Sequence, residues 1–124
     1  MTVGESLANI DEIKPNQVSR EKKIEWLEKI EERIQEEIVK THIGVEQIED
    51  PWYEKESVDE MAELYVKSPY DEVYRWWLAI QIDLVNQEYD KYNAELALFN
   101  QAFLDYASYI NRNYMHTQTK HRGY

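Results

Sequence analysis

The chain of 124 residues is long enough for one domain with a modest hydrophobic core and too short for two. Its formal net charge of −11 disfavours simple binding to the phosphate backbone of nucleic acids or to an anionic membrane surface. The sequence has no cysteine, no apolar run long enough to span a membrane and no recognisable signal peptide. We therefore expect a protein of a reducing interior, or of a particle assembled there.

Two helices are predicted in the first third of the chain. Thr2 and Glu5 have the spacing of a capping box, which indicates that a short helix begins there. Pro15 disfavours helical geometry in the residue before it, so this helix should end near Lys14. A second, amphipathic helix is predicted from Arg20 to about residue 41. Its apolar stripe consists of Ile24, Leu27, Ile30, Ile34 and Ile38.

The opposite face of this second helix, which Ser19 should cap, is acidic. Its carboxylates are Glu25, Glu28, Glu32 and Glu36. Glu31 is expected to share the exposed environment of these side chains, where no burial raises the pKa of a carboxylate. Solvation is the ordinary role of such a charged face.

Residues 44–67 are predicted to be irregular, because they are acidic and polar. We expect Trp52 and Tyr53, which lie in this loop, to contact a neighbouring subunit. Two local structures are open for the second half of the loop: a single turn of helix around Met61, capped by Ser57 and Glu60, or an extended piece at 64–66. We favour the extended piece, whose strand partner could be a second copy of the chain.

Two further helices are predicted after this loop. Ser68-Pro69-Tyr70-Asp71 has the pattern of a helix start, with serine as N-cap and proline at the first helical position. The third helix should run to about Val85, and Asn86-Gln87 could break the chain before a fourth helix. An unbroken apolar pattern argues instead for a single rod; without a glycine or proline at this point both remain open, and we favour the break. The last helix should end near Asn113, and residues 115–124 should form a flexible tail.

An apolar and aromatic pattern with a 3.5-residue period runs through these last two predicted helices. It consists of Leu78, Ile82, Val85, Tyr89, Tyr92, Leu96, Phe99, Phe103, Tyr106 and Ile110. The period is typical of helices that pack lengthwise, and its aromatic members are typical of protein interfaces. Acids rather than lysine and arginine lie between the rings, which disfavours stacking on single-stranded nucleic acid. The residues expected to form a packing and oligomer seam are Tyr89, Tyr92, Phe103, Tyr106 and Tyr109.

No pattern in the sequence points to catalysis or to a bound metal. His42 ends the second helix, and His116 and His121 are five residues apart, whereas helical metal ligands are spaced by three or four. Asp83 and Asp105 flank the aromatic pattern, where we expect structural hydrogen bonds rather than acid–base chemistry. There is no nucleophile elbow, phosphate loop or dinucleotide fingerprint, so we expect neither enzyme activity nor a cofactor.

Several motifs in the segments 6–38 and 68–114 indicate a known family. The most specific are Ser68-Pro69-Tyr70-Asp71-Glu72, Tyr92-Asn93, Phe99-Asn100 and the stretch 109–112. On these motifs, residues 5–114 resemble a family of small helical proteins in phages and prophages of Gram-positive bacteria, the head-to-tail adaptor (head completion, connector) proteins of tailed bacteriophages. This chain has Gln87 where a glycine is expected after Asn86.

The resemblance implies an all-α bundle of about four helices over residues 1–114 and a flexible arm at 115–124. It implies a structural virion protein of the phage neck, assembled in the host bacterial cytoplasm as a ring of about twelve copies. Such a ring would lie beneath the portal protein, extend the DNA channel without sequence-specific binding, and offer a docking platform to a tail or stopper protein. The arm residues expected to contact the portal are Arg112, Lys120, Arg122 and Tyr124. The acids expected to face the channel are Glu25, Glu28, Glu32 and Glu36.

Two other functions are open from the sequence. An acidic phage protein that mimics DNA and inhibits a host protein would use closely spaced carboxylates and would be missing from purified virions. A tail-completion or assembly protein would share the helical character without forming this ring.

Overall fold

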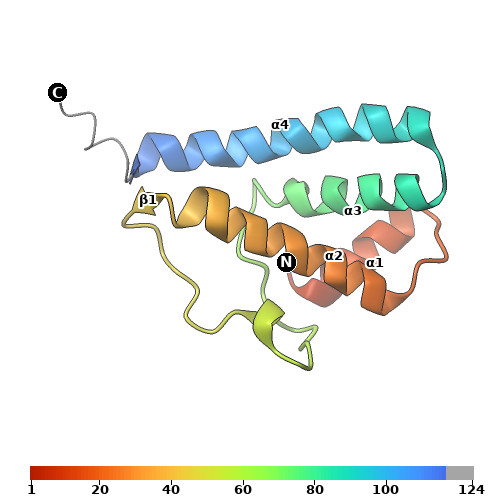
Figure 1. Ribbon diagram of the computed structural model, residues 1–124, viewed down its shortest axis with the longest axis horizontal. Helices are drawn as coiled ribbons and strands as arrows, with labels where there is room; N and C mark the ends of the chain where they lie inside the picture. The colour runs from red at the N-terminus through yellow and green to blue at the C-terminus, as the bar shows by residue number, and fades with distance from the viewer. Residues whose placement is uncertain (117–124) are drawn as a thin grey trace.

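The computed structural model describes residues 1–116, which form four α-helices and a small antiparallel ladder of two strands (Figure 1). The predicted all-α bundle is therefore confirmed. In chain order the elements are α1 (Val3–Ile13), α2 (Arg20–Ile34), the π-helical turn η1 (Gln35–Val39), β1 (His42–Ile43), the 3-10 turn η2 (Trp52–Glu54), α3 (Glu72–Val85), α4 (Tyr89–Asn113) and β2 (Met115–His116).

Helix α3 is the centre of the fold. It packs antiparallel against α4, and α1 and α2 cover its other sides (Figure 1). The core between these helices is apolar and closed to solvent. Its largest fully buried aliphatic side chains are Leu7, Ile10, Leu27, Ile30, Ile34, Leu64, Leu78 and Ile82.

The predicted helix caps in the first part of the chain are confirmed. The backbone N–H of Glu5 donates to Oγ1 of Thr2 at 3.1 Å, and the N–H of Thr2 donates to Oε1 of Glu5 at 2.8 Å. Ser19 Oγ accepts from the N–H of Lys22 at 3.1 Å and caps α2. These caps satisfy backbone donors that have no partner within the first turn of a helix.

The chain breaks between α3 and α4, so the alternative of a single rod is wrong. Gln87 has a φ of 58°, and the N–H of Glu88 donates to the carbonyl of Asp83 at 2.9 Å. This left-handed residue is where the resemblance leads one to expect glycine. The aromatic pattern consequently folds back on itself, and Phe99 of α4 lies 5.3 Å from Trp77 of α3, measured between ring centroids.

Helix α3 begins later than the sequence motif predicts. The Ser68-Pro69 peptide is cis, and the N–H of Tyr70 donates to the carbonyl of Lys67 at 2.9 Å. These residues form a turn, so the helix begins at Glu72 with Asp71 as N-cap, and Ser68 is not its cap.

The predicted extended piece has its partner within the same chain. The N–H of Val3 donates to the carbonyl of Ala62 at 2.9 Å, and the N–H of Leu64 donates to the carbonyl of Met1 at 3.0 Å. Thr2 and Glu63 form the bridge between the two segments. A second copy is therefore not needed to pair this segment.

The C-terminal segment is also paired where the sequence predicts a tail. Met115 lies opposite Ile43 and His116 lies opposite His42 in the β1–β2 ladder. The predicted boundary of the arm at residue 115 is thus wrong for its first two residues, and residues 117–124 lie outside the described part of the chain.

Candidate functional site

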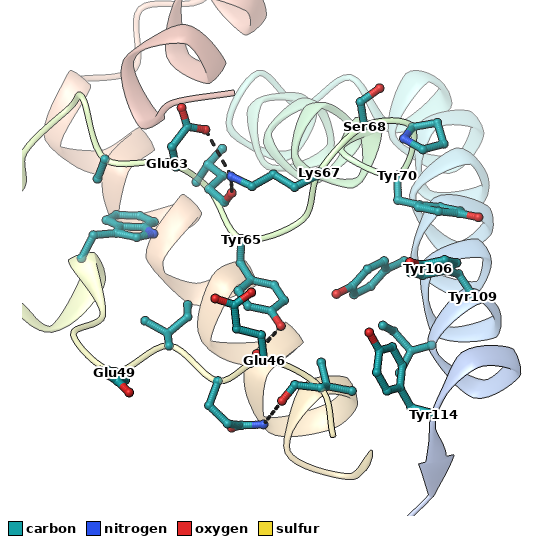
Figure 2. Close-up of a pocket in the computed structure, with 18 of the residues that line it drawn as sticks. Glu46, Glu49, Glu63, Tyr65, Lys67, Ser68, Tyr70, Tyr106, Tyr109 and Tyr114 are labelled. Carbon is teal, nitrogen blue, oxygen red and sulfur yellow. Dashed lines mark hydrogen bonds and ion pairs between the residues drawn. The ribbon is translucent and has the colours of Figure 1, made fainter. Parts of the chain in front are cut away.

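A groove of about 1220 Å³ opens on the surface of the described chain (Figure 2). The loop 45–50 forms one wall, the segment 62–70 crosses it, and the C-terminal half of α4 forms the opposite wall. Five tyrosines reach into this lining from these separate segments: Tyr65, Tyr70, Tyr106, Tyr109 and Tyr114. We name this feature the tyrosine groove.

Three of the tyrosines form one aromatic cluster against the C-terminal half of α4. Tyr70 lies in the turn before α3, and its ring stacks on that of Tyr109 with centroids 4.9 Å apart. The ring of Tyr106 lies 6.0 Å from that of Tyr70. Because Tyr106 and Tyr109 are three residues apart on one helix, they present adjacent rings to the groove. The stack is a rigid aromatic wall that needs little ordering when a partner binds.

The tyrosine hydroxyls are hydrogen-bonding groups rather than bases. Tyr65 donates its hydroxyl to the carbonyl of Glu46, and burial together with the nearby Glu46 carboxylate raises its pKa to about 12. Burial also raises the pKa of Tyr106 well above its usual range. In Figure 2 the rings of Tyr106 and Tyr114 point from the end of α4 into the groove. With these raised pKa values, the hydroxyls of Tyr65 and Tyr106 are protonated at neutral pH.

The charged residues around the groove are mainly acidic. The lining contains the carboxylates of Glu46, Glu49, Asp50 and Glu63. Among the described lining residues the only cation is Lys67, whose Nζ donates to Oε2 of Glu63 at 3.2 Å and to the carbonyl of Leu64 at 2.9 Å. The groove therefore favours a cationic occupant over a phosphate or another anion.

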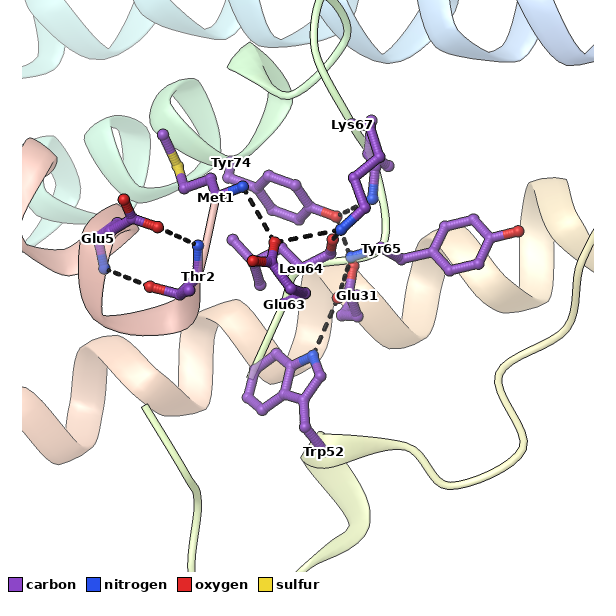
Figure 3. A network of polar contacts seen from close by, with 11 residues as sticks. Met1, Thr2, Glu5, Glu31, Trp52, Glu63, Leu64, Tyr65, Lys67 and Tyr74 are labelled. Carbon is purple, nitrogen blue, oxygen red and sulfur yellow. Dashed lines mark hydrogen bonds and ion pairs between the residues drawn. The ribbon is translucent and has the colours of Figure 1, made fainter. Parts of the chain in front are cut away.

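The buried carboxylate of Glu31 fixes the position of the segment that crosses the groove (Figure 3). Glu31 has no exposed surface, and its Oε2 accepts from Trp52 Nε1 at 2.9 Å and from the N–H of Tyr65 at 2.8 Å. Its Oε1 accepts from the Tyr74 hydroxyl at 2.6 Å, and that hydroxyl accepts from the N–H of Val66 at 2.8 Å. One side chain of α2 thus fixes η2, the segment 64–66 and α3 at once.

The expectation that Glu31 is exposed is wrong. Burial raises its pKa, and the hydrogen bonds from Trp52, Tyr74 and Tyr65 only partly oppose that effect. A signal for this position is present in the sequence. Glu31 lies four residues after Leu27 and three before Ile34, so it falls on the apolar stripe of α2.

Trp52 and Tyr53 are engaged within the chain. Trp52 is only 7% exposed and donates its indole N–H to Glu31, so its predicted role as a contact to a neighbour is wrong for this structure. Tyr53 is half-buried, and its ring meets that of Trp52 edge to face at 5.8 Å. Burial and the nearby Glu31 raise the pKa of Tyr53 to about 12.

The structure separates the five residues of the predicted seam. Tyr106 and Tyr109 lie in the tyrosine groove, whereas the ring of Phe103 lies 4.7 Å from the guanidinium carbon of Arg33. Tyr92 is half-buried against the core, and Tyr89 is 58% exposed at the start of α4. The seam is therefore partly internal packing and partly surface.

Of the acids predicted to face a channel, Glu25, Glu28 and Glu32 lie on α2, and Glu36 lies on η1, which follows it. Glu25 pairs with Lys22 at 3.5 Å, and Glu36 pairs with Lys40 at 2.6 Å. Glu28 is partly buried, and burial together with the neighbouring carboxylates of Glu25 and Glu32 raises its pKa. Lysines thus neutralise part of this row.

The predicted arm residues do not all belong to one segment. Arg112 lies in the last turn of α4 and is exposed, so it belongs to the helical body. Lys120, Arg122 and Tyr124, and also His121, lie outside the described residues.

The fold brings together two histidines that the sequence keeps apart. His42 and His116 meet edge to face with ring centroids 4.9 Å apart. His42 contacts the carbonyl of Ile38 through Nδ1 and Asn111 Oδ1 through Nε2, at 2.7 and 2.6 Å. Within residues 1–116, no three histidine, aspartate or glutamate side chains are grouped to hold a metal.

Asp83 has the structural role expected from the sequence. It is fully buried on α3, and its Oδ1 pairs with Lys14 Nζ at 2.7 Å, which also pairs with Glu95 at 2.7 Å. Asp105 is exposed and accepts from Gln101 Nε2 at 2.7 Å.

In the described part of the chain, no helix has both the length and the apolar character that a membrane span requires. Comparisons with protein-family models, with curated proteins and with solved structures found no match to this chain.

Proposed function

We propose that this protein is a structural component of a tailed-phage particle, a head-to-tail adaptor that works by docking to other proteins. The observation that carries the proposal is the tyrosine groove, because an aromatic wall opposite a row of carboxylates is suited to bind a polypeptide segment. The sequence resemblance supplies the biological setting. In this proposal about twelve copies form a ring between the portal and a tail or stopper protein.

The occupant of the tyrosine groove is, in this proposal, an extended cationic segment of a neighbouring neck protein. Arginine and lysine side chains bind favourably over tyrosine rings and beside carboxylates. The stacked rings of Tyr70 and Tyr109 offer such a surface, and Glu46 and Glu49 belong to the opposite wall of the groove (Figure 2). Lys120, Arg122 and Tyr124 form the proposed contact with the portal.

The acidic row on α2 and η1 is proposed to face the DNA channel, where like charge would keep the duplex from sticking. Replacing Glu25, Glu28, Glu32 and Glu36 by lysine should leave the fold intact and slow DNA passage. Unchanged ejection kinetics in such particles would remove this part of the proposal.

The ion pairs on α2 also bear on the rival function of DNA mimicry. Lys22 and Lys40 lie against two of the four acids, so the row is a poorer copy of a phosphate backbone than its sequence suggests. The adaptor is therefore the better-supported proposal.

The decisive experiment is mass spectrometry of particles purified from the phage or prophage that encodes the chain, with electron microscopy of the neck. About a dozen copies per particle in a ring would support the adaptor. Absence from the particles, with co-purification of a host enzyme, would support the inhibitor instead. Absence from mature particles but presence in assembly intermediates would support an assembly protein.

The groove is tested separately in the same particles. Tyr109→Ala should reduce incorporation of the chain into the neck, because it removes the ring on which Tyr70 stacks. Met61→Ala is the control, since Met61 is 77% exposed and lies outside both the tyrosine groove and the predicted seam. Normal incorporation of a folded Tyr109→Ala chain would contradict docking through the groove.

A further inference from the structure

The face of α4 that points away from α2 and α3 has no partner within the described chain (Figure 1). Two of its leucines are unusually exposed: Leu98 at 46% and Leu104 at 59%. The small or uncharged exposed residues around them are Ala94, Ala97, Gln101 and Ser108. Ala97 and Leu98 are adjacent, and the other successive members are three or four residues apart, so the six form one continuous stripe along the helix. We name these six residues the α4 outer stripe.

The α4 outer stripe differs in charge from the other exposed helix surfaces. In α4, no exposed residue between Lys91 and Asp105 is charged. In α2, by contrast, the exposed face consists largely of glutamate and lysine. Charged residues make up 31% of the whole chain. A stripe with two exposed leucines, and with Asp105 as the one exposed charge of α4 between Lys91 and Arg112, is typical of a contact surface in such a chain.

The charges at the two ends of the stripe identify the partner. Asp90 lies in the first turn of α4 and Arg112 in the last, and each is eleven residues from Gln101. Both are exposed and lie on the same side of the helix as the stripe. If two copies of α4 pack antiparallel with Gln101 at the centre, Asp90 of one faces Arg112 of the other, twice. A parallel pair would place like charges together.

The same register matches the rest of the stripe. Residue i of one helix faces residue 202 − i of the other, so Leu98 meets the partner's Leu104. Ala94 meets the partner's Ser108, and these small side chains let the two helix axes approach closely. Asp105, four residues after Gln101 and three before Ser108, lies within the stripe opposite the partner's Ala97, and its carboxylate accepts from Gln101 Nε2 at 2.7 Å.

We propose that the free chain forms an antiparallel homodimer through the α4 outer stripe, closed at both ends by Asp90–Arg112 pairs. A two-fold contact of this kind closes on itself and does not grow into a ring. The dimer is therefore a state of the chain before larger assembly, and it does not depend on the proposed adaptor function. A single helix pair is a small interface, so association in the micromolar range is expected.

A charge-reversal cycle measured by analytical ultracentrifugation tests the register. Asp90→Arg should weaken the dimer about tenfold, because two ion pairs become repulsive contacts between arginines. Arg112→Asp should weaken it to a similar degree. The double variant should recover the wild-type dissociation constant, because it re-forms both pairs with the charges exchanged. Thermal melts measure the stability of the folded chain in each variant. Each reversal should lower the melting temperature, because it places an unfavourable charge at an end of α4. This loss should remain in the double variant, although its dimer recovers.

A substitution in the centre of the stripe provides the second arm. Leu98→Glu should leave the chain monomeric, since it places a carboxylate against the partner's Leu104. Met61→Glu is the matched control, because Met61 is 77% exposed but lies outside α4. A wild-type chain that stays monomeric at the highest soluble concentration would overturn the proposal. A wild-type dimer in which the double reversal is no tighter than the single ones would also overturn it.

Discussion

The hydroxyl of Tyr74 and the carboxylate of Glu31 form a 2.6 Å hydrogen bond between two fully buried side chains. Tyr74 belongs to α3 and Glu31 to α2, so the bond joins two helices through the core (Figure 3). The same carboxylate accepts hydrogen bonds from the indole N–H of Trp52 and from the backbone N–H of Tyr65. Tyr65 belongs to the segment that crosses the tyrosine groove. Stability and the shape of the groove therefore depend on one acidic residue.

Replacing Glu31 by alanine should destabilise the protein by about 3–5 kcal/mol, because three buried donors lose their acceptor. Glu31→Gln should cost less, about 1–2 kcal/mol, since its carbonyl oxygen still accepts from part of the network. Chemical denaturation followed by circular dichroism measures both values. Glu32→Ala, on the exposed side of α2, is the control and should change the free energy of unfolding by less than about 0.5 kcal/mol. Equal effects at positions 31 and 32 would contradict the role of the network.

The stability that Glu31 contributes should fall as the pH rises. Its folded-state pKa is above the ordinary value of 4.5 because of burial, so the folded protein binds this proton more tightly than the unfolded chain. The contribution is complete below pH 4.5 and is lost as the pH rises through the folded-state pKa. The free energy of unfolding of wild type minus that of Glu31→Gln should therefore decrease from acidic to neutral pH. A difference that does not change with pH would contradict a raised pKa.

Local sequence signals predict the helices of this fold, because caps and apolar stripes act within a few residues. The capping box of Thr2 and Glu5 is one example, and the apolar stripe of α2 is another. Glu31 is missed because its residue type suggests an exposed position while its spacing places it inside. The spacing along α2 determines the burial of Glu31. This burial is tolerated because Trp52, Tyr65 and Tyr74 supply the hydrogen bonds that a buried carboxylate requires.

The tyrosine groove could not be predicted from spacing, because its walls come from segments far apart in the chain. Tyr70 and Tyr109 stack although 39 positions separate them, and Thr2 pairs with Glu63. His42 and His116 meet for the same reason, through a ladder of only two residues per strand. Contacts of this kind depend on how the helices pack, which a single sequence does not specify locally.

The break between α3 and α4 leads to a prediction about Gln87. Its φ of 58° is in the left-handed region, which disfavours any residue with a Cβ by about 1 kcal/mol. Gln87→Gly should therefore raise the melting temperature slightly, or leave it unchanged once the greater flexibility of glycine in the unfolded chain is included. Gln81→Gly, inside α3, is the control and should destabilise by about 1 kcal/mol. A clear loss of stability for Gln87→Gly would show that the glutamine side chain contributes to the turn.

The last prediction concerns the ion pair that ties the end of α1 to α3. Burial lowers the pKa of Lys14, but its bonds to Asp83 and Glu95 more than offset this, and the pKa is raised overall. Lys14→Met should destabilise the fold by about 3–5 kcal/mol, because it leaves the fully buried Asp83 without its cation. Lys22→Met removes an exposed partner of Glu25 and should change the stability by less than about 1 kcal/mol. Adding Asp83→Asn to Lys14→Met should recover part of the loss, because a neutral amide is less costly to bury than an unpaired carboxylate. Failure of that second substitution to recover any stability would show that the destabilisation comes from lost packing of the lysine stem and not from the buried charge.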